Sequence, residues 1–354
     1  MFQPESLAEI LNADFDEVID VRSPSEFDED HVPGAVNLPV LDCEERVRVG
    51  RIYNRESRFR AKRVGAALVA KNIAGHLEGW LANRPGCYRP LVYCWRGGER
   101  SGAMAEVLTR VGWRAETLEG GYRTYRRLVG QSFYDRSFPA DVVLLEGYTG
   151  TAKTLILKQL EQEGAQVINL EELACHRGSL FGATGDAQPT QKAFESALAE
   201  KVNGLDTSKP VVIEAESSKI GDLQIPPSLW AAMQIARRIE LVATIDLRVE
   251  HILTEFAGYV ENRAVLDGSI SSLSTYHSKE RISGWLRLSS EGRFDRLVRD
   301  LMTLHYDPRY RKHRERNPIQ PLLTVQVLGT TEAECAKLAG HIVSEAGLAG
   351  QGVS

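Results

Sequence analysis

Residues 91–102, LVYCWRGGERSG, decide the fold of the first part of this chain. Leu91–Tyr93 is an apolar run typical of a buried strand, and Cys94 follows it directly. A helical pattern begins at Ser101, so the cysteine lies in a loop that leads into a helix N-terminus. The N–H groups of such a loop and the helix dipole lower a thiol's pKa and bind a tetrahedral oxyanion. The alternative is a buried structural cysteine, which the neighbouring glycines and charged residues do not favour.

The same order of strand, loop and helix extends on both sides of this segment. Val18–Val21 is typical of a buried strand, and Ala61–Leu81 has a helical pattern. After Cys94, Ser101–Val111 is typical of an amphipathic helix that ends at Gly112. Strands that alternate with helices predict a parallel sheet covered on both faces.

A second unit of this kind begins at 142–164, VVLLEGYTGTAKTLILKQLEQEG. We predict a first α/β domain over 1–130, a linker over 131–140 and a second α/β domain over 141–354. Within the second domain we expect further strands and helices, with a helical, lid-like segment at Thr254–Ser290. The other elements are strands at Val211–Glu214, Glu240–Ile245 and Leu322–Leu328 and a last helix at Glu332–Ala346.

The composition is that of a globular protein, with 354 residues, 43% hydrophobic and 26% charged. The N-terminus MFQPES lacks the pattern of a secretory signal, and no apolar run reaches the ~18 residues of a membrane span. The five cysteines are odd in number and show no CxxC spacing, which argues against a disulfide framework and a zinc ribbon. We therefore expect a cytoplasmic monomer with reduced thiols and no membrane partner.

The loop GYTGTAKT, residues 147–154, lies between a predicted strand and a predicted helix. It meets the phosphate-binding pattern G-x-x-x-x-G-K-[ST] except that Ala152 replaces the second glycine. Lys153 would reach phosphate oxygens, and Thr154 could be a ligand of Mg²⁺. The alternative is a chance Gly/Thr turn. An adapted phosphate-binding loop fits the flanking strand and helix better.

Two polar clusters in the second domain are further candidates. Glu214 and Glu216 follow an apolar strand and resemble a Walker B site, although strands also end in acidic residues simply at the surface. His176, Arg177 and Ser179 cluster beside glycines in HRGSLFG, which could equally be an ordinary loop.

Two segments resemble the N-terminal and C-terminal motifs of the rhodanese family. They are DVRSPSEFDEDHVPGAVNLP (Asp20–Pro39) and LEGGYRTY (Leu118–Tyr125), and Cys94 matches the family's persulfide-carrying cysteine. The chain departs from ordinary sulfurtransferases because five residues separate Cys94 from Arg100, as in Cys-dependent phosphatases. A longer loop makes a wider cradle, which suits a phosphate-sized group such as selenophosphate.

CWRGG, HRGSLFG and the EAES…KIG run (Glu214–Ser217, Lys219–Gly221) together resemble the tRNA 2-selenouridine synthase family over nearly the whole chain. In that family a rhodanese-like parallel-sheet domain precedes a P-loop NTPase-like α/β domain. Ser218 stands where the family would have Arg, and Ala152 is a second departure.

The resemblance implies that selenium replaces sulfur in the wobble 2-thiouridine (U34) of tRNAs such as those for Lys, Glu and Gln. Geranyl diphosphate first alkylates the sulfur, and selenophosphate then supplies the selenium that displaces geranylthiol. Both donors are co-substrates, with no fixed cofactor, and a selenophosphate supplier is an expected partner.

The resemblance also implies roles for the two loops. Cys94 would form an S-selanylcysteine with help from Arg100, and the selenophosphate cradle would consist of Trp95, Arg96, Gly97 and Gly98. We expect the diphosphate to bind at Gly147, Gly150, Thr151, Lys153 and Thr154, with Mg²⁺ on Thr154. The polar residues assigned to the substrate or its surroundings are His176, Arg177, Ser179, Glu214 and Glu216.

Two basic segments contrast with a formal net charge of -5. Glu45–Arg63 interleaves basic residues with Tyr53 and Phe59, and residues 309–316, RYRKHRER, are more densely basic. Cations neutralise phosphates and aromatic rings stack on exposed bases. A solvated helix face is the alternative for either segment. Because the family acts on tRNA, we expect tRNA contacts from Arg309, Arg311, Lys312, Arg314 and Arg316.

Three other functions fit part of the sequence. One is a rhodanese-type sulfurtransferase or a tRNA thiolation enzyme, which would use a sulfur donor in place of selenophosphate. The second is a Cys-dependent phosphatase, for which no general-acid Asp is evident. The third is a non-catalytic, nucleotide-gated RNA-binding module.

Overall fold

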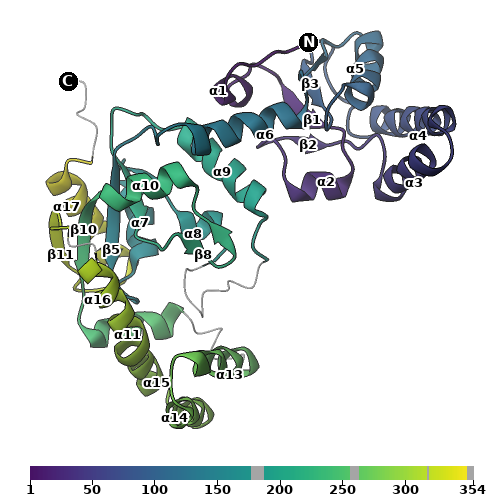
Figure 1. Ribbon diagram of the computed structural model, residues 1–354. Helices are drawn as coiled ribbons and strands as arrows, with labels where there is room; N and C mark the ends of the chain where they lie inside the picture. Colours follow the sequence, from purple (N-terminus) through teal and green to yellow (C-terminus); the bar gives the residue numbers. More distant parts are fainter. Residues whose placement is uncertain (177–186, 256–262, 317–318, 349–354) are drawn as a thin grey trace. The chain divides into compact units, whose positions relative to one another are not determined.

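The computed structural model describes residues 1–176, 187–255, 263–316 and 319–348 (Figure 1). The chain forms two compact units. The first comprises Met1–Ser137 and Pro189–Gly204, and the second comprises Phe138–Gln188 and Leu205–Ser354. Each unit contains a parallel sheet with helices around it, which confirms the predicted fold class.

The first unit is built on a four-stranded sheet in the order β2-β1-β3-β4, with every neighbouring pair parallel. All four residues of β3 are buried, as expected for a strand covered on both faces. Parallel strands end at one edge of the sheet, so the loop after β3 lies there with Cys94 in it. The strands are β1 Glu17–Asp20, β2 Val36–Asn37, β3 Pro90–Tyr93 and β4 Glu116–Thr117.

Helices pack around this sheet over a core that includes Ile19, Val92, Met104 and Leu108. The predicted helix at 61–81 is part of the longer α4. The predicted helix at 101–111 is α5, which starts two residues earlier and ends at Gly112 in the left-handed conformation. The helices are α1 Leu7–Leu11, α2 Pro24–Glu29, α3 Cys43–Arg55, α4 Arg58–Glu78, α5 Glu99–Val111 and α6 Tyr122–Gly130.

The segment predicted as a linker, 131–140, is partly helical. Gln131–Asp135 forms a π-helix that continues α6 and buries Phe133, and the unit boundary falls after Ser137. The predicted second domain, 141–354, also includes a helix that the structure groups with the first unit. This helix is α9, which has its own polar anchor in that unit.

Helix α9, Gln191–Asn203, is held to the first unit by Glu195, which is buried. Glu195 forms an ion pair with Arg126 and accepts a hydrogen bond from the Tyr134 hydroxyl at 2.8 Å. At the helix start, the Thr190 hydroxyl donates to the carbonyl oxygen of Glu29 at 2.5 Å. These contacts explain why a helix that follows the β6 region in sequence packs with the first sheet.

The second unit is built on a five-stranded sheet in the order β11-β10-β5-β7-β6, all parallel. The strand predicted at 240–245 begins three residues earlier, because Glu146 pairs with the buried Arg238 at 3.2 Å and allows that charge inside the sheet. The strands are β5 Val142–Gly147, β6 Gln166–Ile168, β7 Val211–Glu214, β10 Arg237–Val242 and β11 Leu323–Gln326, with a separate hairpin of β8 Lys219–Ile220 and β9 Leu223–Gln224.

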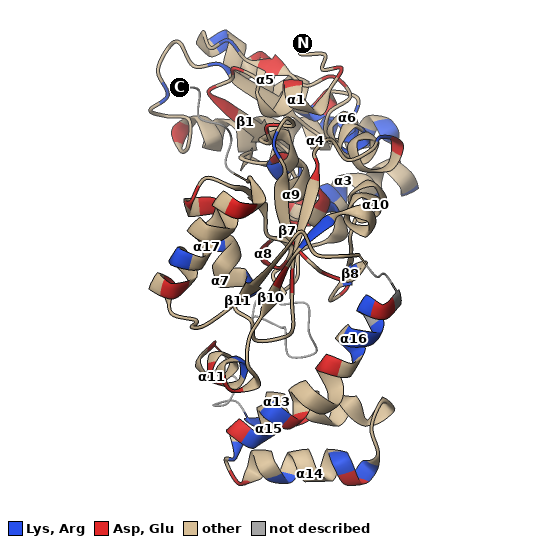
Figure 2. Cartoon of the chain, turned by 90° about the vertical axis from the view of Figure 1, so that its left-hand side faces the viewer, with Lys and Arg blue, Asp and Glu red and all other residues tan. Residues whose placement is uncertain are grey.

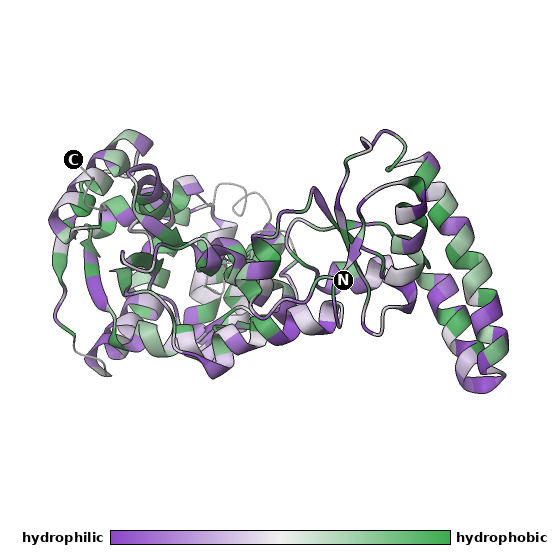
Figure 3. Ribbon diagram, turned by 90° about the horizontal axis from the view of Figure 1, so that it is seen from above, coloured by the Kyte–Doolittle hydropathy of each residue, from purple (hydrophilic) through white to green (hydrophobic). Residues whose placement is uncertain are grey.

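The helices of the second unit form two groups. One group packs on the sheet around Ile156, Val212, Leu241 and Ile342, and hydrophobic residues follow the strands in Figure 3. The other has a core of its own that includes Trp285, so residues 263–290 of the segment predicted as lid-like belong to a small helical bundle. Residues 256–262 of that segment lie outside the described residues. In order they are α7 Lys153–Gln162, α8 Leu170–Leu173, α10 Pro227–Ile235, α11 Ile245–Glu255, α13 Arg263–Ser272, η2 Leu273–Thr275, α14 Lys279–Ser290, α15 Phe294–Leu301, η3 Met302–Tyr306, α16 Asp307–Arg316 and α17 Glu332–Ala346.

None of the helices in the described ranges has the length and apolarity that crossing a membrane requires.

Candidate functional site

Cys94 lies where β3 ends and the chain turns towards α5. Its side chain is 2% exposed, and the Ser101 hydroxyl donates a hydrogen bond to its Sγ at 3.4 Å. Gly97 and Gly98 have φ values of +75° and +76°, the left-handed region that glycine favours, and Gly98 caps α5. The Sγ of Cys94 in turn donates to the carbonyl oxygen of Arg96 at 3.6 Å. Sequence reasoning did not identify Ser101.

The backbone N–H groups of this loop are available to a ligand. Among the described residues, none of the N–H groups of Trp95–Ser101 donates to a backbone carbonyl. Their orientation at a helix N-terminus makes a site for an anion such as phosphate. The exposed Arg96 adds a positive charge beside the loop.

The other side of the loop is held by the start of α6. The N–H of Tyr122 donates to the carbonyl oxygen of Cys94 at 2.8 Å, and the N–H of Arg123 donates to that of Trp95 at 3.2 Å. A Cβ on Gly121 would lie 2.3 Å from the carbonyl oxygen of Cys94. Only glycine at this position allows α6 to approach so closely. This is the physical role of the glycines in LEGGYRTY.

A buried ion pair lies beneath the loop. Asp20 is the last residue of β1 and Arg22 follows the strand. Both are almost fully buried, and they pair through Oδ2 and Nη2 at 2.6 Å. The Arg22 guanidinium lies 4.0 Å from the ring centre of Tyr122, whose hydroxyl donates to Asp30 at 2.7 Å. Burial and the Asp30 charge raise the pKa of Tyr122, so its hydroxyl stays protonated. The rhodanese-like motif at 20–39 therefore contributes a rigid base for the cysteine loop.

Arg100 is oriented by a carboxylate that sequence reasoning did not identify. Its Nη1 donates to Oε2 of Glu26 at 3.0 Å, and only 16% of its side chain is exposed. Burial favours the neutral form of Glu26, but the hydrogen bond and charge of Arg100, together with hydrogen bonds from Ser23, outweigh it and lower the pKa of Glu26. The Arg100 guanidinium is therefore held in place by an ionised partner.

The second candidate loop runs from β5 to α7 and has the predicted strand–loop–helix geometry. The Lys153 amine donates to the carbonyl oxygen of Gly147 at 2.9 Å, and the Thr151 hydroxyl donates to that of Tyr148 at 2.8 Å. Ala152 has a φ of +57°, which costs a residue with a side chain about 1–2 kcal/mol. The substitution noted in the sequence thus adds strain but leaves the turn intact.

Gly150 makes close packing possible behind this loop. It has a φ of +86°, and a Cβ there would lie 2.8 Å from the carbonyl oxygen of Arg248. Arg248 also donates through Nε to the carbonyl oxygen of Thr149 at 2.8 Å and pairs with Asp307 at the start of α16. The loop is therefore supported by α11 and α16.

A carboxylate beside the loop comes from an unexpected position. The Thr154 hydroxyl donates to Glu171 of α8 at 3.1 Å, whereas Glu214 accepts the N–H of Glu171 at 2.6 Å and stabilises the N-terminus of that helix. Sequence reasoning assigned this place to Glu214 and missed Glu171. Glu171 reaches this place because it follows β6, which neighbours β7 in the sheet.

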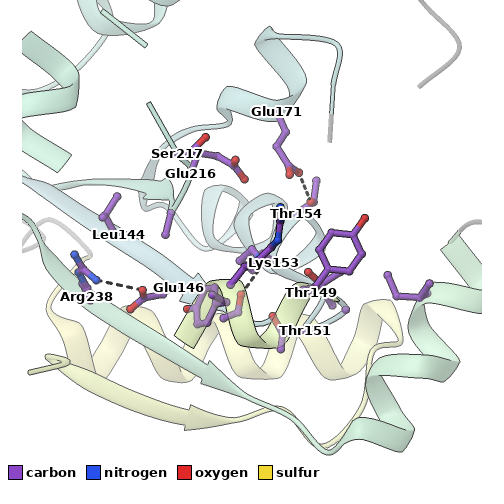
Figure 4. Close-up of a pocket in the computed structure, with 18 of the residues that line it drawn as sticks. Leu144, Glu146, Thr149, Thr151, Lys153, Thr154, Glu171, Glu216, Ser217 and Arg238 are labelled. Atoms are coloured by element: carbon purple, nitrogen blue, oxygen red, sulfur yellow. Dashed lines mark hydrogen bonds and ion pairs between the residues drawn. The ribbon is translucent and has the colours of Figure 1, made fainter. Parts of the chain in front are cut away.

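The carboxylates near Lys153 are crowded. Burial raises the pKa of Glu214 from 4.5 to about 8, with a smaller contribution from the charge of Glu171. Burial, followed by the charges of Glu171 and Glu214, raises the pKa of Glu216, and Lys153 opposes that shift. Figure 4 shows Glu171 and Glu216 near the amine of Lys153. Such a cluster takes up a proton or a cation readily.

A cavity of about 500 Å³ opens above this loop. One wall carries the phosphate-loop residues with Glu171 and Glu216, as Figure 4 shows. The remaining wall combines polar and charged residues, such as Glu146, Arg238 and His251, with apolar and aromatic ones. Its residues include Leu144, Trp230, Met233, Ile252, Tyr306 and Tyr310. A ligand with a phosphate group at one end could place an apolar group against Trp230, Met233 and Ile252 at the other.

Helix α16 is rich in basic residues (Figure 2), and part of this charge is paired within the protein. Arg314 pairs with Glu240 and with Glu146 at 3.8 Å, and Arg309 lies 3.9 Å from the ring centre of Tyr276. Arg311 and Lys312 are exposed, and the side chain of Arg316 lies outside the described residues. Of the four predicted cations whose side chains the structure describes, Arg309, Arg311 and Lys312 are exposed and only Arg314 is partly buried.

His176 lies just after α8, where its N–H donates to the carbonyl oxygen of Glu171 at 3.0 Å. It is therefore part of the same chain segment as the carboxylate beside Thr154. The other two members of the predicted cluster, Arg177 and Ser179, lie outside the described residues.

Comparison with known proteins identifies both units. The family model for the rhodanese-like domain matches residues 3–128, and the model for the tRNA 2-selenouridine synthase AAA domain matches residues 140–287. The second match spans α9, which the structure groups with the first unit.

Curated relatives named tRNA 2-selenouridine synthase come from several bacteria. The one from Hahella chejuensis is 36% identical over 248 residues, which cover 69% of this chain and 63% of the relative. The one from Nitrosomonas europaea is 32% identical over 243 residues, covering 68% and 63%. The match to these two relatives thus spans just under two thirds of their length.

A third relative is matched over a greater length. The tRNA 2-selenouridine synthase of Chromohalobacter salexigens is 32% identical over 333 residues, which cover 86% of this chain and 90% of the relative. This match covers most of both chains, and the two family models match consecutive parts of this chain. The chain therefore belongs to the tRNA 2-selenouridine synthase family.

Proposed function

We propose that this chain is a tRNA 2-selenouridine synthase, which exchanges the sulfur of a 2-thiouridine in tRNA for selenium. The observation that carries the proposal is the loop after β3, where Cys94 accepts the Ser101 hydroxyl bond and the N–H groups of Trp95–Ser101 are available. This loop combines a nucleophile with a site for a phosphate-sized anion. The name shared by the relatives supports tRNA as the substrate.

Selenium transfer is assigned to Cys94. Selenophosphate would bind with its phosphate oxygens on the N–H groups of the loop and beside Arg96, with its selenium near Sγ. Arg100, oriented by Glu26, adds positive charge at the start of α5. For Cys94 to carry the selenium as an S-selanylcysteine, an oxidant such as a disulfide would take up two electrons as the S–Se bond forms and the Se–P bond breaks to release phosphate. A second thiol would return the two electrons when the selenium passes to the nucleoside.

An alkylation step is assigned to the second unit. The thiocarbonyl sulfur would attack the first carbon of geranyl diphosphate, which releases diphosphate and gives S-geranyl-2-thiouridine. Selenium would then add at the same uracil carbon, and geranylthiol would leave. Alkylation converts a poor leaving group into a good one, which is why the two steps belong together.

The cavity above the phosphate loop supports geranyl diphosphate as the ligand. Lys153 and the N-terminus of α7 suit a diphosphate, while Trp230, Met233 and Ile252 offer an apolar wall for the hydrocarbon. A nucleotide would also suit the phosphate loop. The competition between the two ligands for binding therefore tests this assignment.

Mg²⁺ fits the residues present beside this loop. The Thr154 hydroxyl and the Glu171 carboxylate lie 3.1 Å apart, and both are hard oxygen ligands. These two residues would hold the ion with water as further ligands. When bound, it would neutralise charge on the departing diphosphate.

The test uses purified full-length chain, a tRNA containing 2-thiouridine, and both donors. Mass spectrometry of the nucleosides should show 2-selenouridine with the wild type. Cys94→Ser should accumulate geranylated 2-thiouridine, because only the selenium step needs the thiol. Lys153→Ala should form neither product, because the diphosphate loses its main cation.

Cys43→Ser is the matched control, since Cys43 is an exposed cysteine of the same unit. Normal selenation by Cys94→Ser would contradict the proposal. A rhodanese-type sulfurtransferase or tRNA thiolation enzyme is the second candidate, because the rhodanese-like model matches the first unit. Sulfur transfer from thiosulfate without any response to selenophosphate would favour it.

A further inference from the structure

Helices α3 and α4 form a hairpin within the first unit (Figure 1). Small residues allow the two helices to pack closely. Ala61 and Gly65 of α4 are buried, and a Cβ on Gly65 would lie 3.5 Å from Val49 of α3. Figure 3 shows the hydrophilic turn between the helices at the end of the hairpin. The packed face is thus internal to the hairpin, and its outer face is open to solvent.

The outer face is strongly basic. Residues 43–63 contain eight Arg or Lys and three Glu, a net charge of +5, whereas the whole chain has a net charge of -5. The rest of the chain therefore carries a net charge of -10. A concentration of positive charge in an acidic protein is typical of a surface that binds a polyanion.

Five of these cations have no ion-pair partner among the described residues. They are Arg48, Arg51, Arg55, Arg58 and Arg63. Arg48, Arg51 and Arg55 are spaced by three and four residues, so they form one stripe along α3. Unpaired like charges on one stripe destabilise an isolated helix by small amounts. The stripe is therefore more readily explained by an external anion than by the stability of α3.

Exposed aromatic rings lie among these cations. Phe59 is 78% exposed and Tyr53 is 45% exposed. The Arg58 guanidinium lies 5.5 Å from the ring centre of Tyr53. Aromatic rings beside unpaired cations suit single-stranded RNA, because the rings stack on bases while the cations neutralise phosphates.

The hairpin borders the Cys94 loop. Lys62 of α4 pairs with Glu99, the first residue of α5, at 3.4 Å. Arg46 of α3 lies 3.8 Å from Glu26, which in turn pairs with Arg100 at 3.0 Å. An RNA that lies along the hairpin would therefore reach the loop that holds the reactive thiol.

We propose that the outer face of the α3–α4 hairpin is a tRNA-docking surface. Arg48, Arg51 and Arg55 contact the phosphate backbone, and Phe59 stacks on an unpaired base near the modified nucleotide. The inference rests on the proposed function for the identity of the RNA. In α16, by comparison, Arg314 already forms ion pairs with Glu146 and Glu240.

The first test replaces Arg48, Arg51 and Arg55 together with Gln, which keeps the helix and removes three charges. Binding of an unmodified tRNA transcript is measured by fluorescence anisotropy at several salt concentrations, with no donor present. The slope of log affinity against log salt should flatten by roughly 0.7–0.9 per contact, which weakens binding on the order of 100-fold at 0.1 M salt. The matched control replaces three exposed arginines elsewhere on the same unit with Gln, and it should leave the slope unchanged. They are Arg110, Arg114 and Arg127.

The second test replaces Phe59 with Ala. Loss of one stacked base should weaken binding roughly tenfold while the salt slope stays that of the wild type. An unchanged salt slope in the triple Arg variant would overturn the inference. A loss of tRNA binding confined to Arg311→Gln and Lys312→Gln would also overturn it, because docking would then lie on α16.

The assay separates this inference from the proposed function because it involves no selenium chemistry. Wild-type chain that fails to bind tRNA even at low salt would overturn both. Wild-type binding that the hairpin variants do not affect would overturn only the docking surface. Circular dichroism of each variant confirms that the helices remain folded.

Discussion

Replacement of Gly121 by Ala should destabilise the protein more than replacement of a turn glycine that has free space around its Cβ position. Gly121 has φ +60° and ψ -148°, a conformation that is essentially restricted to glycine and costs other residues about 1–3 kcal/mol. Its Cβ would also lie 2.3 Å from the carbonyl oxygen of Cys94, and relief of such an overlap costs about 1–3 kcal/mol more. Gly121→Ala should therefore lower the free energy of unfolding of the first unit by about 2–6 kcal/mol.

Gly34→Ala is the matched control for this prediction. Gly34 has φ +74° in the same unit, and nothing lies within 4 Å of its Cβ position. Its replacement should cost only the left-handed conformation, about 1–2 kcal/mol. With about 2–4 °C per kcal/mol for a unit of this size, the two variants should differ clearly in thermal unfolding of the full chain. Equal shifts would refute the idea that α6 holds the loop by close approach.

Two other changes probe the second unit. Ala152→Gly should raise the free energy of unfolding of this unit by up to about 1 kcal/mol, because glycine removes the strain of φ +57°. Urea unfolding measures this change. A loss of stability would mean that packing of the Ala152 side chain outweighs the strain. Burial raises the pKa of Glu214 from 4.5 to about 8, so the folded state holds an extra proton between these values and stability should fall as pH rises from about 4.5 to 8 and then level off. Glu214→Gln should flatten this dependence in unfolding experiments at pH 5–9, whereas an unchanged slope would show that Glu214 ionises normally in the folded chain.

The local order of the two candidate loops could be predicted from the sequence because each combines an apolar strand, glycines and a helix start. Cys94 and Lys153 both lie in such segments, in loops that follow the ends of parallel strands. The contacts that complete each loop are distant in sequence. Glu26 holds Arg100 from a helix after β1, and Glu171 reaches Thr154 because β6 lies beside β7. Strand order in a sheet, which a single sequence does not reveal, decides such pairs.

The sequence predicted the positions of the candidate loops better than it predicted which charged side chains are free to bind a ligand. Arg314 belongs to a basic run that predicts a surface, but the carboxylates of Glu146 and Glu240 lie close enough to pair with it. Glu214 ends a strand as a Walker B acid would, yet its carboxylate stabilises the N-terminus of α8. In both cases a group on another strand or helix binds the charged side chain. The sequence shows that a charge is present and does not show which group neutralises it.

The placement of α9 has a consequence for the order in which this protein matures on the ribosome. The polypeptide crosses between the units three times, after Ser137, after Gln188 and after Gly204. The first unit therefore cannot complete its structure until residues 189–204 have left the exit tunnel, by which time β5 and β6 have already been synthesised. A nascent chain that stops at Ser137 would leave Arg126 and Tyr134 without the Glu195 carboxylate. Biogenesis of the cysteine-bearing unit is thus tied to synthesis of the phosphate-binding one, and neither can be released as a finished module before the other has begun.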